Sequence, residues 1–464
     1  MSDSGVVARG RLSPAGSVYV CGSCGPKVNC AGVPDSCVDG DGDICFMSKV
    51  TGLPPIVHCS CGINVFAAVS ARGKLFTWGR NTDGRLGTGD TEMRTSPYEV
   101  PFDASIKVAQ VAVGDTHTAC ITSDGSLYTW GTARQGCCAD GNLSTHKILT
   151  PYKVSHRDGS PVSDAVQIQC SSHLTLVLTS DGTVYSCGGG DFGRLGTGSK
   201  DACAWLTKVD PLPKCRSITA GSLYAAAITA APYSGASSTE EQDLSTNVPS
   251  LDTTVGSDET GGDLYMWGCN TSGALGLGHR RHRTRPTRVD MPVGVVDVGC
   301  TKGQVHPRHH QGKNLPGSEG QHTLMAGSDG CLYTCGTAHK GMLGNYNMKV
   351  FCPSDGDELT PYRVGSRTRD GKNPKYLEGK RVTQVCSAHI HSYLASEDGY
   401  MYTFGCGSNG RCGVDAYPHG VHGTKSRLKC YLFSPHRLDS VQDKHAHFIC
   451  VSRYNSMAIM GPRE

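Results

Sequence analysis

Charged and aromatic side chains are scarce in this 464-residue chain, at 18% and 7% of its residues. The formal net charge of +3 is too small to indicate a general affinity for nucleic acid. Long apolar runs are missing as well, and no window is long and apolar enough to cross a membrane. The first residues lack the apolar core of a secretory signal. We therefore expect no membrane insertion and no secretion.

The familiar signatures of catalysis are absent too. The sequence has no Gly-x-Ser-x-Gly elbow, phosphate-cradling loop or dinucleotide fingerprint in a suitable context. Its 24 cysteines are expected to remain thiols, because cysteine-rich disulfide frameworks belong to secreted chains. Cys21-x-x-Cys24, followed by Cys30, Cys37 and Cys45, offers one ligand-like pair for zinc but no matched second pair. These observations predict no catalytic residue, no metal and no cofactor.

The N-terminal residues carry little targeting information. Arg9 and Arg11 leave a mitochondrial transit segment open, and neither end of the chain has a cluster of five or more basic residues. We expect an intracellular protein, in the cytoplasm (the cytoskeleton or an axoneme included), with the nucleus and the mitochondrion as alternatives.

What the sequence does contain is glycine, 60 residues in all, and a repeated phrase. The phrase reads glycine, any residue, an apolar residue, Tyr or Phe, two further residues, then glycine. Its copies are Gly16-Ser-Val-Tyr-Val-Cys-Gly22, Gly73-Lys-Leu-Phe-Thr-Trp-Gly79, Gly125-Ser-Leu-Tyr-Thr-Trp-Gly131, Gly182-Thr-Val-Tyr-Ser-Cys-Gly188, Asp263-Leu-Tyr-Met-Trp-Gly268, Gly330-Cys-Leu-Tyr-Thr-Cys-Gly336 and Gly399-Tyr-Met-Tyr-Thr-Phe-Gly405. A unit this short cannot bury its own apolar face, so it must stack on its neighbours. Cys21, Cys187 and Cys335 stand where other copies have Trp or Phe, which predicts small buried hydrophobes there.

Each repeat contains signals for four short strands. An apolar strand precedes the phrase and is joined to it by Asp-Gly, as in Asp124-Gly125, which favours a type I′ turn. A glycine–leucine signature follows the phrase, as in Gly84-Arg-Leu-Gly87, and we expect its Leu to fill the layer between units. A proline-containing strand such as Ser96-Pro-Tyr-Glu-Val100 comes last, and proline suits an outer edge.

The two ends of the chain each supply half of a repeat. Residues 448–459 match the strand before the phrase and lack a phrase, whereas residues 16–22 have the phrase without that strand. We therefore predict an all-β, seven-bladed β-propeller that is closed by pairing N- and C-terminal half-blades. The predicted organisation is an N-terminal extension (1–15) and a single propeller domain (16–462), with an acidic insertion at 230–262 and a basic, His-rich insertion at 302–320.

The pattern Asp-Gly-x-Leu-Tyr-x-Trp-Gly, followed by Asn/Asp-x-x-Gly-x-Leu-Gly, resembles the repeat of regulator of chromosome condensation 1 and its RCC1-like relatives. The resemblance covers residues 16–462. That family includes the exchange factor for the small GTPase Ran, ubiquitin-ligase modules, chromatin binders and scaffolds in cilia and mitochondria. The resemblance therefore implies a propeller, and it leaves the function open.

The resemblance also implies residues that could meet a partner. His117, His173, His322 and His391 follow Gly-rich corners, where we expect scaffold hydrogen bonds to backbone within a blade. Exchange factors use acidic and His side chains at such corners and a β-wedge in the loop after one blade's Trp-Gly. Matching positions here make Asp115, His117, Arg134, Ser172 and His322 candidate partner-binding residues. Ser172 replaces an Asp of the exchange factors, and the segment 132–138 lacks their polar wedge tip.

Basic residues cluster in two further places. They lie after Gly278 and in the 302–320 insertion, and they form a candidate site for an acidic protein tail or nucleic acid. The candidates are Arg280, Arg281, Arg283, Arg285, Arg288 and Arg308. The alternative is a solvated basic surface. For the acidic insertion, the alternatives are an expanded hairpin and a loop ordered by a partner.

Taken together, the sequence predicts a non-enzymatic platform that binds protein partners through its loop faces, within a large assembly in some cases. The alternative is a guanine-nucleotide exchange factor for a Ran-like small GTPase. A third class, nucleic-acid binding, would depend on the basic residues after Gly278.

Overall fold

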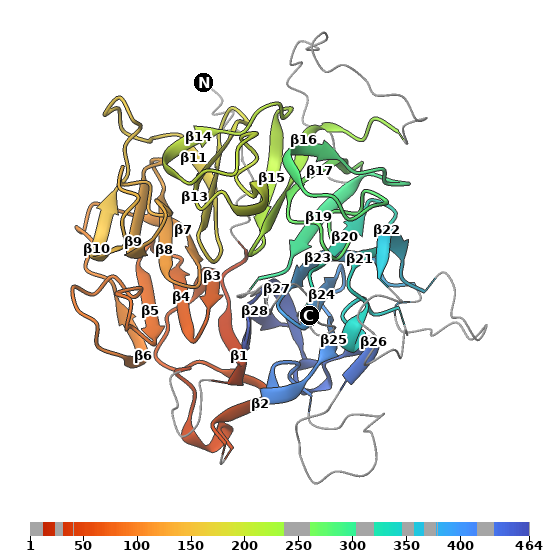
Figure 1. The fold of residues 1–464 in the computed structure, drawn as a ribbon. Coiled ribbons are helices and arrows are strands. Elements are labelled where there is room, and N and C mark those ends of the chain that lie inside the picture. The colour runs from red at the N-terminus through yellow and green to blue at the C-terminus, as the bar shows by residue number, and fades with distance from the viewer. Residues whose placement is uncertain are drawn as a thin grey trace, which may run out of the picture.

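The computed structural model describes residues 13–23, 31–39, 41–235, 260–302, 320–345, 357–365, 377, 379–414 and 431–463. The strands form a ring around a central axis (Figure 1). Five sheets have four strands each, and a sixth has eight strands because two blades are joined at one point, Gly262 opposite Val295. The predicted all-β, seven-bladed propeller is thus confirmed. No helix in the described residues is long and apolar enough to span a membrane.

Six blades follow one another along the chain, each running from the innermost strand outwards. Blade one contains β3 (Ile56–Gly62), β4 (Val65–Ser70), β5 (Leu75–Gly79) and β6 (Arg94–Glu99). Blade two contains β7 (Val108–Val113), β8 (His117–Thr122), β9 (Leu127–Ala133) and β10 (His146–Lys153). Blade three contains β11 (Ala165–Cys170), β12 (Leu174–Thr179), β13 (Val184–Gly188) and β14 (Cys203–Lys208). Blade four contains β15 (Cys215–Ala220), β16 (Tyr224–Pro232), β17 (Gly262–Gly268) and β18 (Arg283–Arg288). Blade five contains β19 (Val295–Cys300), β20 (His322–Gly327), β21 (Leu332–Gly336) and β22 (Glu358–Arg363). Blade six contains β23 (Val382–Ser387), β24 (His391–Ser396), β25 (Met401–Cys406) and β26 (Tyr431–Arg437).

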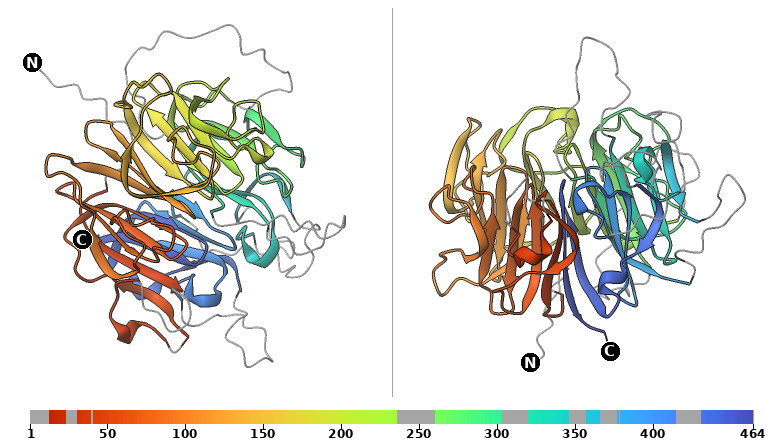
Figure 2. Two further views of the ribbon diagram at one scale, coloured as in Figure 1. Left: turned by 60° about the vertical axis from the view of Figure 1, so that its left-hand side comes forward. Right: turned by 90° about the horizontal axis from the view of Figure 1, so that it is seen from below.

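Blade seven is built from both ends of the chain. Its order is β27 (Lys444–Val451), β28 (Asn455–Pro462), β1 (Ser17–Ser23) and β2 (Asp43–Lys49). Strands β1 and β28 pair antiparallel from Ser17 opposite Met460 to Gly22 opposite Asn455. They lie side by side in every view, red against dark blue (Figure 2). The predicted closure by half-blades is confirmed.

The ring has two faces that are used differently. The corners between first and second strands and the loops after third strands share one face, which we call the corner face. The hairpins between second and third strands lie on the opposite, turn face. The acidic insertion joins β16 to β17 and therefore leaves from the turn face, whereas Lys302, at the start of the basic insertion, lies on the corner face. Residues 236–259 and 303–319 of these insertions lie outside the described residues.

The hairpin turns differ from the predicted type I′ form. Only the glycine of each Asp-Gly pair has positive φ, +79° at Gly125, whereas Asp124 does not. Gly125 N–H donates to Thr122 O (2.9 Å) and Thr122 N–H to Ser126 O (3.0 Å), which makes a three-residue loop with a glycine bulge. The Asp124 carboxylate accepts the Ser126 N–H at 3.2 Å. Asp therefore serves as an acceptor within the turn, because its carboxylate bonds a backbone N–H of the three-residue loop.

The remaining repeat predictions agree with the structure. Prolines lie in the outermost strands β6, β10, β18 and β22. The leucine of the glycine–leucine signature is fully buried at Leu86, Leu195, Leu275 and Leu343. Cys21, Cys187 and Cys335 are also fully buried, as predicted.

Neighbouring blades are joined through one backbone carbonyl in the loop after each third strand. In blade two, Trp130 Nε1 donates to Arg85 O of blade one (2.8 Å), and Thr118 Oγ1 donates to the same oxygen (2.9 Å). Indole or hydroxyl donors from the following blade reach the equivalent carbonyl elsewhere around the ring: Trp78 to Ala31 O, Thr175 to Cys137 O, Trp267 to Arg194 O, Thr323 to Ala274 O, Ser392 to Met342 O and Ser456 to Arg411 O. Every one of the seven joints has this loop-carbonyl bond.

Cysteine replaces tryptophan as a donor at three of these joints. Cys335 Sγ lies 3.3 Å from Ala274 O, Cys21 Sγ lies 3.6 Å from Arg411 O, and Cys187 Sγ lies 3.8 Å from Cys137 O. Since a thiol is a weak donor, these cysteines contribute a hydrogen bond as well as apolar volume.

A second bond at three joints comes from histidine. His117 Nε2 lies 2.8 Å from Thr175 Oγ1, and the pairs His322–Ser392 (2.8 Å) and His391–Ser456 (3.1 Å) repeat it. Each hydroxyl donates its one hydrogen bond to a loop carbonyl and can only accept from the histidine. The histidine must therefore donate from Nε2. The imidazole of each histidine thus bonds a side chain of the following blade. The prediction that it bonds backbone within its own blade was wrong. Leu174 takes this position in blade three, where it pairs with Gly188, so His173 lies outside the pattern.

The loop-carbonyl bond predicts a specific loss on mutation of Trp130. Trp130→Phe removes one donor from a buried joint, and we expect a loss of about 1–2 kcal/mol in the free energy of unfolding. Trp205→Phe is the matched control, because Trp205 is half-buried in the outer strand β14 and donates no hydrogen bond to a described residue. Urea denaturation measures both variants. Equal losses would contradict a contribution from the indole bond.

Two of the joint histidines, His322 and His391, predict that acid weakens the ring. Burial first, then the nearby His389, lowers the pKa of His322 from 6.5 to about 3, and burial also lowers the pKa of His391. The unfolded chain binds these protons below pH 6.5, so the free energy of unfolding falls between pH 6.5 and 3. Each histidine contributes about 1.4 kcal/mol per pH unit.

His322→Gln keeps a donor and removes the proton-binding site. We expect its free energy of unfolding, measured in urea between pH 7 and 4.5, to fall less steeply with pH by about one proton. His156→Gln, at a half-buried position between β10 and β11, is the control for the substitution itself. An unchanged slope in His322→Gln would be the contradicting result.

Candidate functional site

The corner at the start of blade two contains the candidates Asp115 and Ser172. Asp115 follows β7, and Ser172 occupies the equivalent corner of blade three. Ser172 Oγ donates to Asp115 Oδ2 at 2.6 Å, and both residues are buried. Burial raises the pKa of Asp115, while the Ser172 hydroxyl and the Arg85 guanidinium lower it in part. The structure brings these two candidates together as a contact between blades.

Arg85 explains why this corner is held inward. It belongs to the glycine–leucine signature of blade one, and its side chain is buried. Arg85 Nη1 donates to Asp115 O at 2.5 Å. Arg194 reaches Ser222 O (3.2 Å) in the same way, and Arg411 reaches Arg453 O (3.1 Å). An arginine from one blade therefore fixes the corner of the next in three places.

Arg134 is the candidate that remains available on the corner face. It follows β9, its side chain is exposed, and no hydrogen bond or ion pair joins that side chain to a described residue. The rest of its loop turns inward, since Cys137, Cys138 and Ala139 are fully buried. The segment that matches the wedge of the exchange factors is therefore largely packed into the blade.

His117 and His322 are the joint histidines described above, with exposed fractions of 0%. Their Nε2 atoms bond Thr175 and Ser392 of the following blades. Their structural role is thus assigned by geometry, and a role in partner binding stays a prediction.

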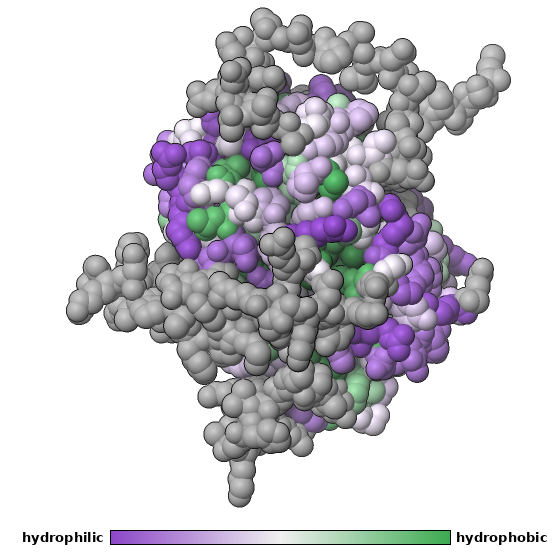
Figure 3. Space-filling model, turned by 90° about the vertical axis from the view of Figure 1, so that its right-hand side faces the viewer, coloured by the Kyte–Doolittle hydropathy of each residue, from purple (hydrophilic) through white to green (hydrophobic). Residues whose placement is uncertain are grey.

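The basic candidates after Gly278 lie on the outer edge of blade four. Arg280 pairs with Asp357 (2.9 Å) and Arg288 with Asp263 (2.9 Å). Arg283 Nη2 lies 2.8 Å from His279 Nε2, and Arg285 Nη1 donates to Asp210 O at 2.8 Å. Hydrophilic residues are prominent on the described surface of this side of the ring (Figure 3). Four of these arginines therefore have partners within the chain.

Two further candidate positions have a different status. Arg281 is exposed, and among the described residues its side chain bonds to no other group. Arg308 lies outside the described residues, as do Cys24 and Cys30 of the zinc motif. No described His, Cys, Asp or Glu side chains form a group of three or more that could hold a metal ion.

The axial channel contains polar residues that the sequence reasoning missed. One residue of each innermost strand occupies the same register position: His58, Gln110, Gln167, Ser217, Asp297, Gln384 and Phe448. Most of them bond backbone of the following blade; for example, Gln110 Nε2 donates to Val166 O (3.0 Å) and Gln384 Nε2 to His447 O (2.8 Å). A polar residue in the middle of six innermost strands was the available signal.

Comparison with known proteins agrees with this architecture. The model described as "Regulator of chromosome condensation (RCC1) repeat" matches residues 72–121, 124–178, 181–228 and 261–304. The chain is similar to the E3 ubiquitin-protein ligase HERC2 of Homo sapiens, with 30% identity over 351 residues, which cover 75% of this chain and 6% of HERC2. It is also similar to the Ultraviolet-B receptor UVR8 of Arabidopsis thaliana, with 26% identity over 372 residues, which cover 79% of this chain and 69% of UVR8.

Solved structures show the same fold at lower identity. Yeast RCC1 (Prp20), bound to Kap60, has a TM-score of 0.71 and 19% identity, and the match covers 100% of this chain and 95% of that chain. Human WBSCR16 has a TM-score of 0.69 and 16% identity, with 97% and 99% covered. The repeat phrases, the closed ring and these matches together show that the chain belongs to the RCC1-like repeat family of β-propellers.

Proposed function

We propose that the chain is a non-enzymatic platform that binds protein partners on its corner face. The observation that carries this proposal is the contrast between buried and exposed candidate residues near the corner of blade two. Asp115 and Ser172 are buried and bonded to each other, whereas Arg134 is exposed with no side-chain partner among the described residues. A rigid ring that presents exposed loop residues is suited to docking, because little ordering entropy is lost on binding.

Several features weigh against exchange activity. A wedge that displaces nucleotide must compete for the phosphate- and magnesium-binding conformation of the GTPase, which calls for exposed polar groups. The corresponding loop here buries Cys137 and Cys138. Ser172 stands in place of the Asp of exchange factors, and its hydroxyl donates a hydrogen bond to the Asp115 carboxylate. An aspartate at 172 would bring two carboxylates together at this buried contact.

Exchange on a Ran-like small GTPase remains the second candidate. The observation in its favour is Asp115, which keeps the acidic residue of that corner and retains some exposed surface, at 8%. We infer a position inside the cell for either function, because the described cysteines are free thiols, as a reducing compartment would keep them. Docking of an acidic tail or nucleic acid at Arg281 and its neighbours is a further expectation of this proposal.

Release of labelled GDP from a panel of Ran-like GTPases separates the two candidates. We expect the protein to leave the release rate within about twofold of the spontaneous rate, since the wedge segment is packed into blade two. Acceleration by several orders of magnitude would overturn the platform-only proposal. Such a result should then be sensitive to Asp115→Asn.

A charge reversal at Arg134 tests the docking face. Arg134→Glu changes an exposed side chain without removing an internal bond, so the ring should keep its stability. We expect partners captured by the wild-type protein under native conditions to be lost or reduced at least tenfold. Lys153→Glu is the matched control on the outer strand of the same blade, where Lys153 is also exposed. Equal loss from both variants would count against the corner face.

A further inference from the structure

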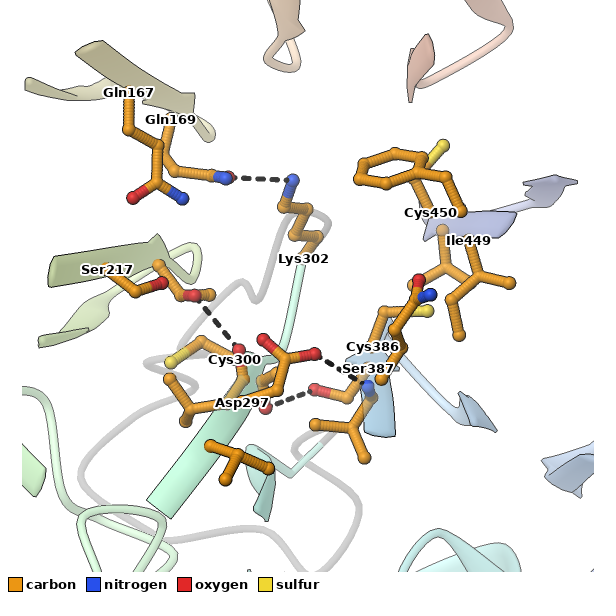
Figure 4. Close-up of a pocket in the computed structure, with 18 of the residues that line it drawn as sticks. Gln167, Gln169, Ser217, Asp297, Cys300, Lys302, Cys386, Ser387, Ile449 and Cys450 are labelled. Atoms are coloured by element: carbon orange, nitrogen blue, oxygen red, sulfur yellow. Dashed lines mark hydrogen bonds between the residues drawn. The ribbon is translucent and has the colours of Figure 1, made fainter. Parts of the chain in front are cut away.

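The axial channel contains a cavity that the proposed platform function does not use. Its volume is about 150 Å³, and its walls come from the innermost strands of the blades. A water molecule occupies about 30 Å³ of liquid, so the cavity has room for a few waters or one small molecule. The close-up of this cavity shows polar side chains reaching inward from several blades (Figure 4).

Most polar groups of the wall are already engaged. Gln167 exchanges two hydrogen bonds with the backbone of Ile218, at 3.2 and 2.9 Å. The Asp297 carboxylate accepts the Val385 N–H at 2.9 Å. Phe448 packs on the ring of His58, with centroids 4.9 Å apart. These groups hold the blades together, so they are poor candidates for ligand contacts.

Lys302 is the exception. Its backbone N–H donates to Ser387 O (3.2 Å), which fixes its main chain beside blade six. Its ammonium then crosses the channel to Gln169 Oε1 on β11, 3.4 Å away (Figure 4). Charge-assisted bonds are ordinarily 2.7–2.9 Å long, so this contact is weak. The ammonium has three donors and, among the described residues, no carboxylate partner.

The cavity wall as a whole has more cations than carboxylates. Arg216 lines the same cavity and donates to Val295 O at 2.9 Å, which adds a second cation to the wall. Asp297 is the one carboxylate among the lining residues. His58 adds no positive charge, because burial and then Lys302 lower its pKa to about 4 and keep its ring neutral near pH 7. Lys302 is half-buried, and an ammonium that is partly withdrawn from water interacts more strongly with an anion than it would in bulk water.

We propose that this cavity binds a small oxyanion, held by the Lys302 ammonium and by the carboxamide N–H of Gln169. The amide nitrogen belongs to the same carboxamide whose Oε1 accepts from the ammonium, and it has no bond to a described residue. Phosphate and a small carboxylate share this chemistry, and the cavity volume admits either. A bound oxyanion would link blade three to the start of the basic insertion beside blade six, and so would stabilise the ring.

Ligand-dependent stabilisation tests the site. Thermal unfolding of the full chain is followed while inorganic phosphate or acetate is titrated, with chloride holding the ionic strength constant. We expect the Tm of the wild-type protein to rise and saturate, and calorimetry to give a finite Kd. Saturation with phosphate alone, acetate alone or both supports the site and identifies its preferred source of oxyanion. No saturation with either would overturn the proposal.

Variants separate specific binding from general salt stabilisation. Lys302→Met should weaken binding at least tenfold, and Gln169→Ala should weaken it by a smaller factor. Lys200→Met, at an exposed position remote from the channel, removes the same charge and should bind as the wild type does. Equal Tm rises in Lys302→Met and the wild type would refute the site. Gln169→Ala and calorimetry on the wild type decide the question if Lys302→Met fails to fold.

Discussion

The ring depends on one carbonyl oxygen in the loop after the third strand of each blade. A four-stranded sheet of this size buries little by itself, so the joints between blades must hold the structure together. At Arg85 that oxygen receives both an indole and a hydroxyl from blade two, and at Ala274 it receives a thiol and a hydroxyl from blade five. A buried carbonyl without a donor would be costly, which explains why the donor can change from Trp to Cys while the bond persists.

This arrangement also decides which residues are free to act on other molecules. Histidines and arginines near the corners look like candidates for contact, but Arg85 and His117 are buried in joints. Arg134 interrupts the pattern, since blade two has Cys137 and Cys138 in the loop where blade one has Arg85. Lys302 interrupts it on the channel side. The positions that leave the repeat pattern are therefore the ones that we propose as binding positions.

Much of the fold could be predicted from the sequence because the repeat phrase fixes strand order and burial together. Trp130, Cys187 and the pairing of β1 with β28 follow from its spacing. The turn at Asp124 was predicted wrongly, because Asp-Gly permits a bulged loop as readily as a type I′ turn. The burial of Asp115 was out of reach, since it is imposed by Arg85, 30 positions away on another blade. The channel residues, by contrast, left a signal in the sequence, because six of the innermost strands have a polar residue at the same position.

Closure by both ends of the chain has a consequence for synthesis. Asn455 Nδ2 donates to Ser23 O across 432 positions of sequence. Strand β1 can pair with β2 on one side early, but its other side has no partner until β28 is made. At ribosomal speeds of about 5–20 residues per second, β1 waits roughly 20–90 s. Its apolar residues and unpaired edge are open to chaperones, or to other nascent chains, throughout that interval.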